Sequence, residues 1–64
     1  MTLHELRQVK SLLQMYFFWL DQVSDNRLNV LYVARDKLSE RAYRAFMECL
    51  IIYGRTGHRM VVTV

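Results

Sequence analysis

The first third of the chain carries apolar residues at alternating spacings of three and four, a pattern that keeps side chains on one face of an α-helix. The members of this stripe are Leu6, Val9, Leu13, Tyr16, Leu20 and Val23. Thr2 precedes the stripe and Glu5 follows three residues later, which is the spacing of an N-terminal capping box. The sequence therefore predicts a helix over residues 2–24.

A second apolar repeat follows the turn-forming residues Ser-Asp-Asn at 24–26. Its members recur with a 3.5-residue spacing, and they are Leu28, Leu31, Leu38, Ala42, Ala45, Cys49 and Ile52. Because the repeat stays in phase, it predicts one long helix over residues 26–53. Gly54 then stands where a left-handed residue commonly ends a helix.

The segment at 29–33 allows a second interpretation, because its β-branched and aromatic residues also suit a strand. In that case Asp36 or Ser39 caps a shorter helix over residues 40–53. No proline interrupts the segment, which favours the continuous helix.

The C-terminal part divides into a basic turn at 54–59 and a short β-prone segment, Met-Val-Val-Thr-Val, at 60–64. The short connection at 24–26 makes the two helices antiparallel neighbours. The predicted fold is mainly all-α: an antiparallel helical hairpin with a short C-terminal β-strand, in a single domain over residues 1–64.

The six consecutive apolar residues at 15–20 exceed what a hairpin core can bury, because on a helix they cover the whole circumference. The chain has 64 residues and one cysteine, so it forms no internal disulfide, and its two histidines and one cysteine lack the spacing of zinc ligands. Chains of this size usually gain stability from disulfides, metals or oligomerisation, so we expect a homodimer. The expected interface residues are Leu12, Val23, Arg35, Ile52 and Tyr53.

Placing the apolar run on the helix assigns Tyr16, Phe17 and Leu20 to the core and leaves its other large side chains at the edge or the back. These side chains, together with aromatic and basic residues elsewhere, are of the types that dominate binding energy at protein interfaces. The expected partner-binding residues are Met15, Phe18, Trp19, Tyr43, Arg44, Arg55, His58 and Arg59.

The sequence offers no pattern typical of catalysis. Cys49 lies on the predicted core stripe, where a thiol behaves as a small apolar group. His4 and His58 are expected to be solvated, and the segment from Gly54 to Gly57 lacks the Lys-Ser or Lys-Thr of a phosphate-binding loop. We therefore predict a non-enzymatic protein without a catalytic, metal or cofactor site.

Charge leaves a second function open. The net charge is +3, and residues 27–64 carry seven basic and three acidic residues, a net +4. A small DNA-binding regulator of winged-helix type would use 40–53 as its recognition helix and the basic turn and strand as its wing. The apolar side chains of Phe46, Met47 and Ile51 disfavour this alternative, because they suit a major groove poorly.

The N-terminus lacks the basic region of a signal peptide, and no apolar run approaches the roughly 20 residues of a membrane span, so a cytoplasmic protein is expected. With its compact size, two predicted helices and excess apolar surface, the chain resembles the small phage-encoded helical-hairpin proteins that disable host regulators, such as quorum-sensing anti-activators. The resemblance implies an inhibitor that occupies the DNA-binding or assembly surface of a host regulatory protein. A structural subunit of a helical assembly is the remaining alternative.

Overall fold

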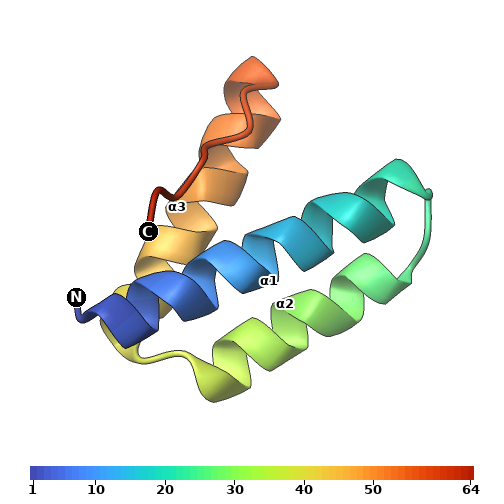
Figure 1. Ribbon diagram of the computed structural model, residues 1–64. Helices are drawn as coiled ribbons and strands as arrows, with labels where there is room; N and C mark the ends of the chain where they lie inside the picture. Colours follow the sequence, from blue (N-terminus) through green and yellow to red (C-terminus); the bar gives the residue numbers. More distant parts are fainter.

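The structure, a computed structural model, describes residues 1–64 and contains three α-helices and no strand. The helices are α1 (Leu3–Asp21), α2 (Asn26–Lys37) and α3 (Glu40–Thr56). α1 and α2 lie side by side and antiparallel, α3 crosses them steeply, and residues 57–64 return as an irregular tail (Figure 1). The all-α class is confirmed, whereas the predicted C-terminal strand is wrong.

The N-terminus of α1 is fixed by the capping box predicted from the sequence. The Thr2 hydroxyl accepts the Glu5 backbone N–H at 3.1 Å, and the Thr2 N–H donates to Glu5 Oε1 at 2.9 Å. Two backbone N–H groups that the helix leaves without partners are satisfied in this way.

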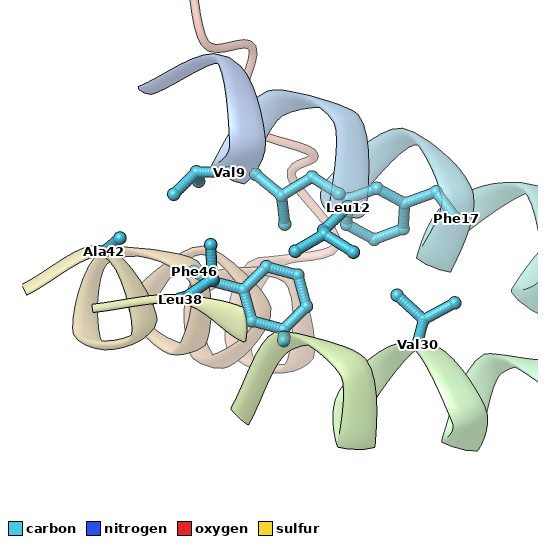
Figure 2. Packing of buried hydrophobic residues seen from close by; sticks show 9 residues of the cluster. Val9, Leu12, Phe17, Val30, Leu38, Ala42 and Phe46 are labelled. Carbon is cyan, nitrogen blue, oxygen red and sulfur yellow. The ribbon is translucent and has the colours of Figure 1, made fainter. Parts of the chain in front are cut away.

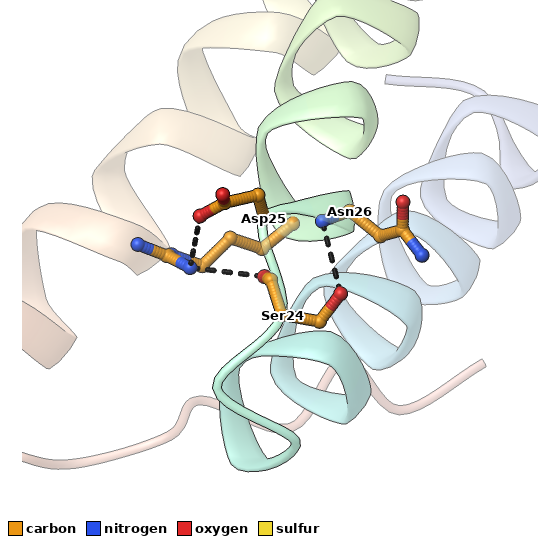
Figure 3. Close-up of polar contacts among 4 residues, drawn as sticks. Ser24, Asp25 and Asn26 are labelled. Atoms are coloured by element: carbon orange, nitrogen blue, oxygen red, sulfur yellow. Dashed lines mark hydrogen bonds and ion pairs between the residues drawn. The ribbon is translucent and has the colours of Figure 1, made fainter.

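At its other end α1 closes with a Schellman motif that reverses the chain direction. The Ser24 N–H donates to the Trp19 carbonyl and the Val23 N–H donates to the Leu20 carbonyl, both at 3.0 Å. Val23 adopts a left-handed backbone with φ of 53°, at the position where glycine is usual. The Ser24 hydroxyl then accepts the Asn26 N–H at 3.1 Å at the start of α2 (Figure 3).

The long helix predicted over residues 26–53 is wrong, because the chain breaks between α2 and α3. Leu38 takes an extended conformation (φ −81°, ψ 146°) and buries its side chain, and Ser39 is also extended. The Ser39 hydroxyl accepts the Ala42 N–H at 3.3 Å, so a side chain replaces the backbone partner that a continuous helix would supply. The helix start at residue 40 was part of the second interpretation, but residues 29–33 are helical rather than a strand.

A hydrogen bond joins the start of α3 to the start of α1. The Ser39 hydroxyl donates to Glu5 Oε2 while Glu5 Oε1 accepts the Thr2 N–H. One carboxylate therefore links the N-caps of two helices. The hydrogen bond from Ser39, followed by those from Thr2, lowers the pKa of Glu5 from 4.5 to about 2.

The core comprises nine apolar residues contributed by all three helices and the α2–α3 connection (Figure 2). They are Val9, Leu12, Leu13, Phe17, Val30, Ala34, Leu38, Ala42 and Phe46. Phe46 and Ala42 are fully buried, and Ala34 on α2 is fully buried as well. α2 thus buries Val30 and Ala34, whereas Leu28 of the predicted repeat is exposed and Leu31 is half-buried against the core.

The end of α3 also differs from the prediction. The helix continues through Gly54 to Thr56, and Gly57 is the residue with positive φ (74°), donating its N–H to the Tyr53 carbonyl at 2.8 Å. The following tail forms no strand, because no second extended segment lies beside it to complete a ladder. Its half-buried residue is Val62, which packs against the core.

Truncation of Phe46 tests this core. We expect Phe46→Ala to lower the free energy of unfolding by about 3–5 kcal/mol, because the ring is fully enclosed and its removal leaves a cavity. Urea titration followed by circular dichroism measures the loss. A change below about 1 kcal/mol would show that α3 does not pack through Phe46.

Acid titration tests the Glu5 link. Because the pKa of folded Glu5 is about 2, below its ordinary 4.5, its stabilising contribution is complete above pH 4.5 and is lost as the pH falls toward 2. In thermal melts from pH 6 to pH 2, wild type should therefore lose more stability than Glu5→Gln. Parallel losses in the two proteins would contradict the assignment.

Candidate protein-interaction surface

The outward side of α2 carries large apolar residues, because this helix buries Val30 and Ala34 and packs only Leu31 besides them against the core. Tyr32 is 73% exposed, Leu28 45% and Val33 44%. Monomeric proteins scatter single apolar residues on their surfaces, but adjacent large ones mark contact sites. α2 is therefore apolar on the core side and on the solvent side.

A groove between α2 and α3 gathers several of these side chains. On α2 it is lined by Leu28, Leu31, Tyr32 and Arg35, and Tyr43 of α3 closes it. A second depression continues along α3 and shares Tyr43, with Arg44, Met47, Glu48 and Ile51 as its other lining residues. We call the two depressions together the α2–α3 groove.

The groove mixes aromatic, aliphatic and basic groups. Arg44 is held by Glu40 one turn earlier, at 2.7 Å, whereas Arg35 makes no salt bridge and is exposed. Tyrosine, methionine and arginine are enriched at the centres of protein interfaces. The groove thus combines residue types that are enriched at such interfaces.

A second apolar surface covers the last turns of α1 and the turn after it. Phe18 is 55% exposed, Met15 48% and Val23 88%, and the rings of Phe18 and Trp19 meet edge to face with centroids 4.9 Å apart. We call these four residues the α1 surface. Val23 is a β-branched residue in a left-handed conformation, and the monomer offers it no packing in return.

The structure places the other predicted contact residues differently. Leu12, predicted at a dimer interface, is only 8% exposed and belongs to the core. Ile52 and Tyr53 are half-buried, and the Tyr53 ring packs on Phe17 with centroids 5.0 Å apart. Tyr53 also packs against the core.

The basic residues near the C-terminus separate into two kinds. Arg55 and His58 are exposed, as a contact residue requires. Arg59 instead makes a bidentate pair with Asp21, with Nη1–Oδ2 at 2.9 Å and Nη2–Oδ1 at 2.5 Å. The hydrogen bonds from Arg59 lower the pKa of Asp21, and those with Asp21 and Tyr53 raise the pKa of Arg59.

The side chains form no cluster that could bind a metal ion, because no three histidine, cysteine or acidic residues lie together. Cys49 is half-buried, and burial, followed by the charge of Glu48, raises the pKa of its thiol. A raised pKa keeps the sulfur protonated near neutral pH and makes it a weak nucleophile. None of the three helices has the length and apolar character needed to cross a membrane.

The α2 part of the groove was missed in the sequence, because Leu28 was assigned to the core, and Leu31, assigned there too, both packs partly against the core and lines the groove. The signal that could have found it is the four-residue spacing of Val30, Ala34 and Leu38, which competes with the chosen repeat.

No protein family, curated protein or solved structure matches this chain.

Replacement of Val23 by glycine tests the strained turn. Glycine adopts positive φ without a steric penalty, but it loses more conformational entropy than valine on folding. The steric gain is larger than this entropic cost, so Val23→Gly should raise the free energy of unfolding by about 0.5–1 kcal/mol. Val23→Ala is the matched control, because it keeps a Cβ in the same backbone conformation and should gain less. A clear loss of stability in Val23→Gly would mean that the valine side chain is packed.

Proposed function

We propose that this protein is a non-enzymatic protein-binding module and that the α2–α3 groove is its main binding face. The observation that carries the proposal is the two-sided apolar character of α2, which buries Val30 and Ala34 inside while Leu28 and Tyr32 face solvent. A helix that is apolar beyond its core stripe is typical of one covered by another protein.

The groove favours a protein partner over a nucleic acid. Nucleic-acid binding depends on basic side chains free to reach phosphates. Arg44 and Arg59 are each paired with a carboxylate, and the groove itself is lined mainly by apolar residues. The winged-helix alternative also loses its wing, because residues 60–64 form no strand.

The proposed action is steric masking by a small chain. The protein acts by covering a surface that its partner needs, such as the DNA-binding or assembly surface of a regulator. This is the mode of action implied by the resemblance to small phage-encoded anti-activators. Self-association through the groove or the α1 surface is part of the same proposal, and a homodimer is its first candidate complex.

Substitutions in the two surfaces test the proposal. Tyr32→Ala and Phe18→Ala each remove an exposed ring, so each should change the free energy of unfolding by less than about 1 kcal/mol. Tyr32→Ala should weaken binding to the natural partner at least tenfold if the groove is the main face. The partner is identified by affinity capture from the native host and mass spectrometry, and then titrated with each variant by calorimetry.

Asn29→Ala is the matched control, because Asn29 is an exposed polar residue of α2 that does not line the groove. Unchanged affinity in Tyr32→Ala would sink the proposal that the groove is the main face, whereas a loss confined to Phe18→Ala would assign binding to the α1 surface. Sedimentation of wild type and the same variants separates self-association from partner binding. DNA affinity that falls steeply with rising salt would support the nucleic-acid alternative instead.

A further inference from the structure

The C-terminal tail lies against α1 and forms one wall of a groove with it. α1 contributes Lys10, Leu13, Gln14 and Phe17 to this groove, and residues 59–62 of the tail lie over them. In Figure 1 the tail leaves the end of α3 and runs back beside that helix. We call the surface beneath it the tail groove.

Arg59 occupies a site that is built for a guanidinium group. Asp21 binds it through two hydrogen bonds, and the guanidinium carbon lies 4.8 Å from the centroid of the Phe17 ring and 5.3 Å from that of Tyr53. A carboxylate in fork geometry together with two aromatic faces is specific for arginine over lysine. The three groups come from α1 and α3, so the helices hold them independently of the tail.

The tail has few other attachments. Val62, three residues after Arg59, is half-buried against the core, whereas Met60 is 41% and Val61 83% exposed. No backbone–backbone hydrogen bond involves residues 58–64, and the Lys10 ammonium donates to the Val64 carbonyl at 3.4 Å. The tail is thus held by the side chains of Arg59 and Val62 and by the bond from Lys10, and a segment without a backbone ladder opens easily.

The tail also fills its groove incompletely. A cavity of about 220 Å³ remains between the tail residues Arg59 to Val62 and the side chains of Leu13 and Phe17. Gly57, with positive φ and nothing within 4 Å of where its side chain would be, provides a pivot at the end of α3. The tail can therefore swing out without disturbing the helix.

We propose that the tail groove is a recognition site for an extended segment of a partner protein that carries an arginine and, three residues later, an aliphatic side chain. The chain's own tail displays this chemistry at Arg59 and Val62 and acts as an internal competitor that occupies the site until such a segment displaces it. This site uses residues outside the α2–α3 groove, so it stands or falls independently of the function proposed above.

The competition makes the proposal testable with the full-length chain. An intramolecular tail competes at a high effective concentration, in the millimolar range for a short flexible connection, so wild type should bind an added segment weakly. Arg59→Ala removes the main anchor of the tail while leaving Asp21, Phe17 and Tyr53 in place. The variant should bind a fluorescent peptide of residues 57–64 at least tenfold more tightly than wild type in an anisotropy titration.

Two controls identify the arginine site as the cause. The same peptide with its arginine replaced by alanine should bind Arg59→Ala at least tenfold more weakly, and the double variant Arg59→Ala with Asp21→Asn should lose affinity for the original peptide to a similar degree. Equal affinity for the two peptides, with circular dichroism showing a folded variant, would overturn the proposal.

A measurement on wild type covers the case in which Arg59→Ala does not fold. Excess peptide should shift the methyl resonances of Met60 and Val62 toward those of a free tail, and the alanine peptide should not. Unshifted resonances at peptide concentrations of several millimolar would refute displacement. A concentration-dependent wild-type dimer that exchanges tails would assign the groove to a second copy and would also overturn the proposal as stated.

Discussion

The break at Leu38–Ser39 is the constraint on which the rest of the structure depends. Without it, residues 26–53 would run as one helix beside α1, and α3 could not cross the other two. The hydroxyl of Ser39 satisfies the Ala42 N–H and is itself bound by Glu5, so the break is stabilised from both sides. Because α3 then turns back over α1, Phe46 is enclosed on all sides and becomes the centre of the core.

The same break decides which residues are left over for binding. A separate α2 buries Val30 and Ala34, packs Leu31 partly against the core, and turns Leu28 and Tyr32 to solvent. The core that results has nine residues, which is small for a chain of 64 that has no disulfide. Much of the apolar content therefore lies on the surface, where a partner or a second copy can bury it.

The features that depend on neighbouring residues could be predicted from the sequence. The features that depend on contacts between distant segments could not. The capping box of Thr2 and Glu5 and the all-α class could be predicted because they rest on neighbouring residues. The break entered only the second interpretation, with Asp36 or Ser39 as the cap, because the repeat stays in phase across it and neither glycine nor proline marks it. The tail was misjudged because β-propensity needs a neighbouring strand, and Arg59 could not be matched to Asp21, 38 residues earlier, without the fold.

Phe17 links the tail groove to the core. Its ring is 8% exposed, packs edge to face on Tyr53 and lies beneath the Arg59 guanidinium. An arginine bound there stabilises the contact between α1 and α3 whichever chain supplies it. The chain's own tail, when it occupies the tail groove, and a partner's segment, when it has displaced the tail, would thus support the same packing of α1 against α3. Replacement of the tail by a partner's segment therefore leaves the core packed. The chain can hold its tail in the groove and release it without loss of its fold.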